Sequence, residues 1–237
     1  MAALAAADGI GQIVATPHNL RWGPGGNRER IAALAARVQR EIDARALPLR
    51  LLVGTEVYIT PDLSAQLDDG RAYPLNGSRY ILVELGFTSW PDFTESALSE
   101  LQARGLVPIL AHAERYAAVQ RNPDRLRPLV ERGVLVQITA GSLLGVFGAE
   151  AERAAKVLLE HRLAHVLASD GHNIHSRAPV LSTAAQVAAK VLGGEEALAL
   201  VAAVPAAIVR DEPLAVAPPL PVPQQRSWFD WLWSGRS

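Results

Sequence analysis

The stretch at residues 79–112, RYILVELGFTSWPDFTESALSELQARGLVPILAH, decides the fold class. Its apolar runs at 79–85 and 106–111 are typical of buried strands, and the segment 92–104 between them is typical of a helix. Gly105 lies between this helix and the second strand, as a C-cap glycine does. A strand, a helix and a strand of these lengths predict a βαβ unit, in which the two strands run parallel.

The same alternation continues along the 237 residues. The predicted strands are apolar throughout, which indicates burial on both faces and therefore a parallel sheet. The fold class is α/β, and the length fits one β/α barrel or two small domains. Residues 1–7 are typical of the end of a helix. Further strands are expected near 12–16, 50–58, 134–139 and 164–169, and further helices near 27–45, 123–132, 149–162, 177–192 and 195–203.

Composition excludes several classes of function. The net charge is −1 and no basic run occurs, so nucleic acid is not an expected partner. The chain has no cysteine, which excludes a thiol nucleophile and a thiolate zinc site. We expect no signal peptide and no membrane span, because the start lacks a cationic region and no run of about 18 apolar residues occurs. The expected location is the cytoplasm.

The character of the chain changes near residue 211. Five prolines between 213 and 223 predict an extended linker after a domain at 1–210. An aromatic segment, WFDWLW, follows at residues 228–233. Trp and Phe favour interfaces, so this tail is expected to make peripheral contact with the inner membrane or with a partner. The alternative is that it folds back onto its own barrel.

Six residues of metal-ligand type come directly after apolar runs. The C-terminal ends of parallel strands meet on one rim of a β/α barrel, so these side chains are expected to lie close together. A histidine or glutamate at one strand end is more often a capping or surface residue, but five successive strand ends of this kind favour a metal site. The six residues are His18, Glu56, Glu84, His112, Asp170 and His172.

Three imidazoles and three carboxylates form a nitrogen and oxygen donor set that suits Mn, Fe, Zn or Mg. Six ligands exceed the needs of one catalytic ion, so two or three ions are expected. Arg115 and Arg177 accompany the ligands, and arginine presents a planar fork of donors to phosphate. The alternative for both arginines is a surface salt bridge or a position at a helix N-terminus.

Six motifs in order carry a resemblance to a known family. They are Ala15–His18, Gly54–Glu56, Asn76–Glu84, Ala111–Tyr116, Ile138–Gly145 and Ser169–Asn173. Together the motifs, which span roughly residues 1–210, resemble the bacterial PHP-type (polymerase and histidinol phosphatase) protein tyrosine phosphatases, the CpsB/YwqE-like group.

The resemblance implies a distorted (β/α)7 barrel with a multinuclear site that favours manganese. It implies that the substrate is the phosphotyrosine tail of a membrane-associated bacterial tyrosine kinase that controls capsule or exopolysaccharide export. By matching motifs, the six ligand-type residues carry over as metal ligands. Arg115 and Arg177 carry over as phosphate-binding catalytic residues.

The chain departs from the family pattern at its start. The family opens with a strand that bears His-x-His, followed by an Asp-Asp-Gly turn, and neither occurs here. Met1 aligns inside the next helix, so one barrel strand and two histidine ligands are expected to be missing. Either the start codon has been placed too late or the chain is a truncated form.

The expected reaction is direct hydrolysis, in which a metal-bridging hydroxide attacks phosphorus in line and the arginines hold the equatorial oxygens. Two alternatives remain at this point. One is a small-molecule PHP phosphoesterase of the histidinol-phosphatase type. The other is an inactive truncated form that still binds a kinase tail.

Overall fold

The computed structural model of the protein describes residues 1–19 and 28–223. The aromatic segment at 228–233, for which membrane or partner contact was expected, lies outside the described residues. Within the described part, no helix combines the length and the apolar character that crossing a membrane requires.

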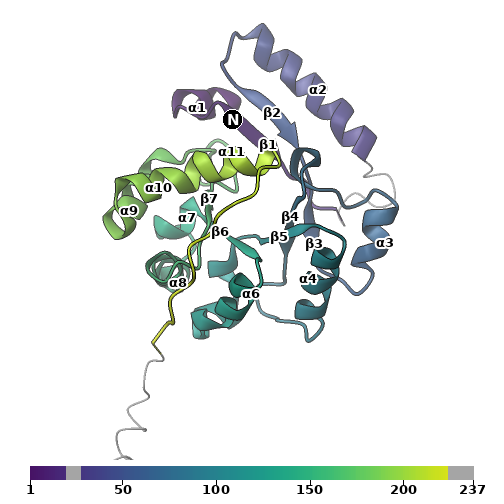
Figure 1. The fold of residues 1–237 in the computed structure, drawn as a ribbon. Coiled ribbons are helices and arrows are strands. Elements are labelled where there is room, and N and C mark those ends of the chain that lie inside the picture. Colours follow the sequence, from purple (N-terminus) through teal and green to yellow (C-terminus); the bar gives the residue numbers. More distant parts are fainter. Residues whose placement is uncertain (20–27, 224–237) are drawn as a thin grey trace, which may run out of the picture.

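All strand pairs in the described part are parallel, which confirms the α/β class (Figure 1). One sheet pairs β1 with β2, and the other has the order β3-β4-β5-β6-β7. The strands are β1 Gln12–Ala15, β2 Arg50–Val53, β3 Glu56–Tyr58, β4 Tyr80–Glu84, β5 Val107–Leu110, β6 Leu135–Thr139 and β7 Val166–Ala168.

The strand expected at 50–58 is divided into β2 and β3 at Gly54. A Cβ atom at Gly54 would lie 2.6 Å from the Leu75 side chain and 3.1 Å from its Cα, so the close approach of this turn requires glycine. The chain that follows β1 runs beside the break between β2 and β3. His18 forms a parallel bridge there with Glu56. This single bridge joins the two-stranded sheet to the edge of the five-stranded sheet at the start of β3.

Helices surround the strands on the outside (Figure 1). The predicted helix at 177–192 begins only at residue 182, because His172 and Asn173 donate backbone hydrogen bonds to the Arg177 carbonyl and close a loop. The α-helices are α1 Ala2–Ala7, α2 Arg28–Ala44, α3 Leu63–Asp68, α4 Thr94–Ala103, α5 Ala117–Arg121, α6 Arg127–Glu131, α7 Ala140–Leu143, α8 Ala149–Glu160, α9 Ser182–Leu192, α10 Gly194–Val201 and α11 Ala203–Val209. The short 3₁₀ turns include η2 Leu75–Gly77, η3 Ala113–Arg115 and η4 Pro123–Leu126.

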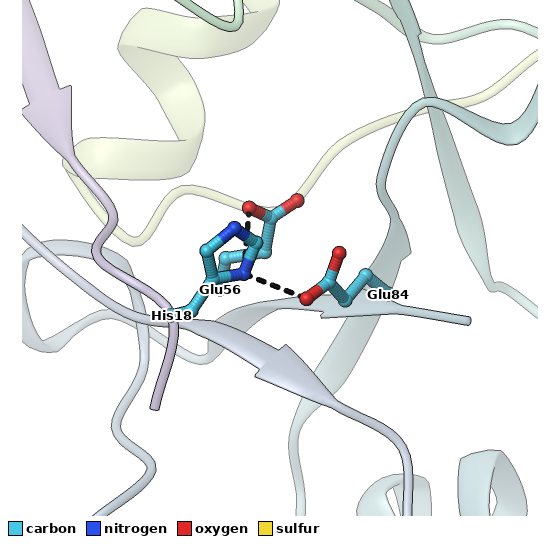
Figure 2. A group of neighbouring side chains, drawn as sticks. All are labelled: His18, Glu56 and Glu84. Atoms are coloured by element: carbon cyan, nitrogen blue, oxygen red, sulfur yellow. Dashed lines mark ion pairs between the residues drawn. The ribbon is translucent and has the colours of Figure 1, made fainter. Parts of the chain in front are cut away.

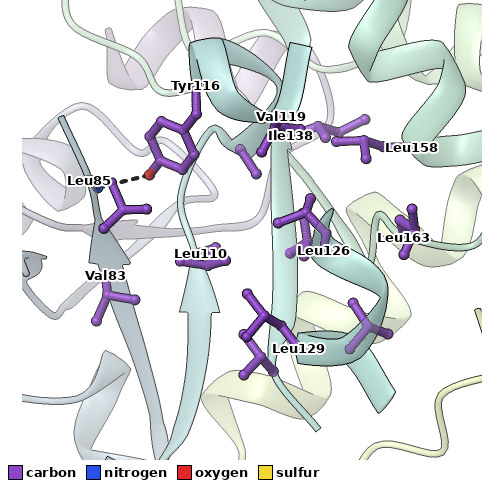
Figure 3. Close-up of a cluster of buried hydrophobic side chains, with 14 of the residues drawn as sticks. Val83, Leu85, Leu110, Tyr116, Val119, Leu126, Leu129, Ile138, Leu158 and Leu163 are labelled. Carbon is purple, nitrogen blue, oxygen red and sulfur yellow. Dashed lines mark hydrogen bonds between the residues drawn. The ribbon is translucent and has the colours of Figure 1, made fainter. Parts of the chain in front are cut away.

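Both faces of the central strands are buried, as the apolar runs predicted. In β4, Ile81 and Val83 pack with the surrounding helices, whereas Tyr80 and Leu82 belong to a second cluster that also contains Ile208 of α11. Figure 3 shows the first of these clusters between the strands and the helices outside them. Period-two alternation places Glu84 on the same side of β4 as Tyr80 and Leu82.

The segment after residue 211 packs on the body of the protein. Tyr80 donates its hydroxyl to the Glu212 carbonyl, Leu220 donates its N–H to the His161 carbonyl, and Val222 donates its N–H to Asp124. The proline-rich linker is therefore anchored at several points up to residue 222. The division of the chain into domains at residue 210 stays a prediction.

Candidate metal centre

Three side chains from neighbouring strands meet at one point: His18 follows β1, Glu56 begins β3 and Glu84 ends β4 (Figure 2). The Nδ1 atom of His18 lies 2.6 Å from Glu84 Oε1 and 3.4 Å from Glu56 Oε2. One ligand atom from each of the three residues lies within 4.8 Å of the others. The spacing matches side chains that surround a single small cation.

His112 completes this group from the end of β5. Its Nε2 atom lies 3.0 Å from Glu56 Oε1 and 3.5 Å from Glu84 Oε2. Its side chain is only 3% exposed, and its Nδ1 atom is buried without a hydrogen-bond partner in the described part of the chain. We refer to His18, Glu56, Glu84 and His112 as the four-residue centre.

The charges in this centre are strongly coupled. Burial alone would raise the pKa of Glu84, but hydrogen bonds from His112 and His18 lower it to about 2. Burial alone would lower the pKa of His112, but hydrogen bonds to Glu56 and Glu84 raise it to about 9. Two carboxylates in a buried site therefore demand positive charge, and in the metal-free chain a protonated imidazole supplies it.

The residues present fit a divalent cation. Two carboxylates and two imidazoles provide hard oxygen and borderline nitrogen donors, a set that suits Mn, Fe or Zn. A cation would replace the proton on the buried imidazole as the balancing charge, and both carboxylates already face the same point. The four-residue centre could therefore hold at least one ion.

Asp170 and His172 lie in a second group, beyond the end of β7. The Asp170 carboxylate accepts a hydrogen bond from Arg177, and the Arg115 guanidinium lies 3.5 Å from the same oxygen. The Nδ1 atom of His172 lies 2.8 Å from the Asp170 carbonyl, which leaves Nε2 as its free ligand atom. The structure thus brings Arg115 and Arg177 together at Asp170. In the described part, it does not place Asp170 or His172 among the ligand atoms that gather at His18.

Two of these residues have left-handed backbone conformations. His112 has φ 36° and Asp170 has φ 47°, which are uncommon values for residues other than glycine. Each costs of order 1 kcal/mol or more and persists only where surrounding contacts fix it. The strain lies at strand ends that carry ligand-type side chains, a pattern typical of functional sites.

Four further residues shape the site without having been singled out from the sequence. The hydroxyl of Tyr116 accepts from the Leu85 N–H and donates to the Ala111 carbonyl, so it joins the ends of β4 and β5 (Figure 3). Glu114 is fully buried, and its carboxylate accepts hydrogen bonds from the Thr139 N–H and the Ser142 hydroxyl. The other two are Phe87 and Phe147, whose rings lie against Arg115.

Only some of these four residues could have been identified from the sequence. Glu114 and Tyr116 stand in the Ala111–Tyr116 motif, and their adjacency to His112 was a signal. Phe147 lies in a glycine-flanked loop 32 positions from Arg115, and nothing in the pattern indicates the contact between them.

Comparison with known proteins identifies the family of the chain. The family model described as "Capsular polysaccharide synthesis, CpsB/CapC" matches residues 1–210. The chain belongs to this family. The resemblance drawn from the six motifs is thereby confirmed.

Two relatives of the chain are named tyrosine-protein phosphatases. The chain is 34% identical to tyrosine-protein phosphatase YwqE of Bacillus subtilis, over 82% of this chain and 77% of that protein. It is 32% identical to tyrosine-protein phosphatase CpsB of Streptococcus pneumoniae, over 86% of each. A solved structure described as that of YwqE and CpsB, "unique metal-dependent tyrosine phosphatases", superposes with a TM-score of 0.89 at 32% identity, covering 94% of this chain and 90% of that one.

Proposed function

We propose that this CpsB/CapC-family chain is a metal-dependent protein tyrosine phosphatase, a phosphoric monoester hydrolase. Its substrate is the phosphotyrosine tail of a tyrosine kinase of capsule or exopolysaccharide biosynthesis. The observation that carries the proposal is the convergence of the four-residue centre in a chain whose relatives are named metal-dependent tyrosine phosphatases. We place the reaction in the cytoplasm, close to a kinase at the inner membrane.

We assign the metal ligands to both groups of the site. His18, Glu56, Glu84 and His112 would hold ions from one group, and Asp170 and His172 from the other, with two to three ions in all and manganese preferred. The nitrogen and oxygen donor set suits Mn, Fe, Zn or Mg, and the preference for manganese rests on the resemblance to the family. Bound there, such ions would supply a nucleophile near neutral pH and neutralise charge on the phosphoryl group.

The arginines of this chain bind and orient the phosphate. Arg115 and Arg177 already face one carboxylate, Asp170, which is the arrangement that two forks of donors need to hold a tetrahedral anion. By holding the equatorial oxygens, the two arginines would orient the phosphoryl group toward the ligand-type residues. The positive charge of the arginines stabilises the charge that develops in the transition state.

The finer fold assignment is part of the proposal. The parallel order β3-β4-β5-β6-β7, with the β1-β2 pair joined to it by the His18–Glu56 bridge, supports a wall of the distorted (β/α)7 barrel type. In such a wall, Glu84 ends β4 and His112 follows β5 at the same rim, and Glu56 reaches both of them from the start of β3.

A small-molecule phosphoesterase is not favoured, because the matched relatives are named protein phosphatases. The test is hydrolysis of a phosphotyrosine peptide with and without added Mn²⁺, compared with a phosphoserine peptide and with histidinol phosphate. Manganese-dependent release of phosphate from the phosphotyrosine peptide supports the proposal. Preference for histidinol phosphate, or turnover that a chelator leaves unchanged, contradicts it. Stoichiometric peptide binding without turnover would indicate the inactive binding form.

A further inference from the structure

The Phe147 ring contacts both arginines of the site. The Cζ atom of Arg115 lies 4.1 Å from the centroid of this ring, and the Cζ atom of Arg177 lies 5.7 Å from it. The ring of Phe87 covers Arg115 as well, at 4.3 Å, and lies 5.3 Å from the His112 ring. Phe147 is therefore the one residue in the described structure that lies within cation–π distance of both guanidinium groups.

Two guanidinium groups at one site repel each other, and Asp170 carries only one negative charge to balance them. A carboxylate also occupies the N–H donors that a phosphate needs. An aromatic face attracts the cation through its quadrupole and leaves the N–H donors free. A ring between two arginines can therefore keep them close together without competing with the anion that they bind.

The Phe147 ring packs against the backbone of Gly141, and we call this contact the seat of the ring. A Cβ atom at Gly141 would lie 2.8 Å from Cε2 of this ring, closer than real Cβ contacts allow. Gly141 does not have a positive φ, so its role is to leave space for the ring. The loop is closed by a 2.8 Å hydrogen bond from the Val146 N–H to the Gly141 carbonyl, which brings the ring back over the glycine.

We propose that Phe147, seated on Gly141, is a positioning residue that holds Arg115 and Arg177 as a pair for binding the phosphoryl group. Phe87 supports Arg115 from the β4 side. This role rests on the proposed function in so far as the two arginines bind phosphate. It adds a residue that touches neither the ions nor the reacting bond.

The first test measures binding of inorganic phosphate to the manganese-loaded protein by calorimetry, which needs no turnover. Phe147→Leu keeps an apolar side chain but removes the ring, and should weaken phosphate binding by about tenfold, the size of a partly desolvated cation–π contact. Phe147→Tyr keeps the aromatic face and should restore binding. Val146→Ala is the matched control, because Val146 is half exposed on the same loop and its backbone hydrogen bond remains.

The second test changes the seat and leaves the ring. Gly141→Ala should weaken phosphate binding as Phe147→Leu does, because the added Cβ displaces the ring. Alanine suits the helical position in α7, which offsets part of the stability lost to this displacement. The double variant should bind phosphate no more weakly than Phe147→Leu alone. Metal content should stay at the wild-type value in all of these variants.

The outcomes separate this role from the proposed function. If Phe147→Leu loses phosphate affinity while the wild type fails to hydrolyse phosphotyrosine, the positioning role stands and the proposed function fails. If the wild type hydrolyses phosphotyrosine and Phe147→Leu matches it in phosphate affinity and kcat/KM, the positioning role is overturned. Absence of phosphate binding by the wild-type protein would overturn it too.

Discussion

The His112 imidazole is 3% exposed, and its Nε2 atom faces both carboxylates of the four-residue centre. His112→Ala should reduce phosphatase activity by at least about a hundredfold, since even the outer partners of metal ligands cost about 10- to 100-fold when removed. Bound metal, measured by elemental analysis, should fall with the activity. His161→Gln is the control, because His161 precedes β7 at the opposite end of the strand. Wild-type turnover of His112→Ala at saturating manganese would contradict the ligand assignment.

The same imidazole gives the metal-free protein a pH-dependent stability. Because the pKa of His112 is raised from 6.5 to about 9, its contribution is complete below pH 6.5 and is lost as the pH rises toward 9. The pKa of Glu84 is lowered from 4.5 to about 2, so its contribution is lost only as the pH falls below 4.5. The melting temperature measured in chelator should therefore fall between pH 6.5 and 9.

His112→Gln should remove this alkaline loss. Burial lowers the pKa of His165 to about 4, so the contribution of that residue is lost as the pH falls from 6.5 toward 4. Above pH 6.5, His165 adds no slope, and the difference between wild type and variant isolates His112. Parallel melting curves for the two proteins across pH 6.5–9 would show that the imidazole is not the balancing charge.

At the scale of elements, two buried tyrosines mark the two ends of β4. The Tyr116 hydroxyl joins Leu85 to Ala111, next to Glu84 and His112, whereas the Tyr80 hydroxyl bonds the Glu212 carbonyl at the other end. Tyr116→Phe should cost roughly 1–3 kcal/mol in the free energy of unfolding, because it leaves the buried Leu85 N–H without its partner. Tyr80→Phe should cost less, about 0.5–1.5 kcal/mol, because the carbonyl that its hydroxyl bonds belongs to Glu212, which is exposed to water.

Only Tyr116→Phe should also lower activity, because it loosens the register of the strand ends that carry two proposed ligands. Denaturant unfolding and phosphopeptide hydrolysis on the same two variants measure both effects. Equal activity in the two variants would mean that the β4–β5 connection does not position the site.

The sequence pattern predicted these elements where a local period determines them. The apolar run at β4 and the ligand-type residue after it placed Glu84 correctly at a strand end, and the same holds for His112 after β5. The division of β2 from β3 was not predicted, because it depends on the close approach of Leu75 to Gly54. The contact of Phe147 with two arginines was not predictable either, since it joins loops after β5, β6 and β7. Local period carries no information on contacts of that range.

At the scale of the whole molecule, one carboxylate joins the segment before β1 to the segment after β7. Asp8, just after α1, accepts hydrogen bonds from the Leu181 and Ser182 N–H groups at the start of α9 and from the Ser182 hydroxyl. These N–H groups have no partner within the helix, so Asp8 acts as a cap supplied from 173 residues away. The bonds to Leu181 and Ser182 lower the pKa of Asp8 although burial works in the opposite direction.

Asp8→Ala should lower the free energy of unfolding by about 1 kcal/mol, the usual cost of losing a helix cap. Asp8→Asn keeps one acceptor oxygen and should lose less, so the pair of variants separates the hydrogen bonds from the charge. If the cap also holds α1 against α9, Asp8→Ala should increase hydrogen exchange in both segments and leave β4 and β5 protected. Unchanged exchange in α1 would mean that the N-terminal helix is held by the packing of Ala5 against Ile42 and Leu49 alone.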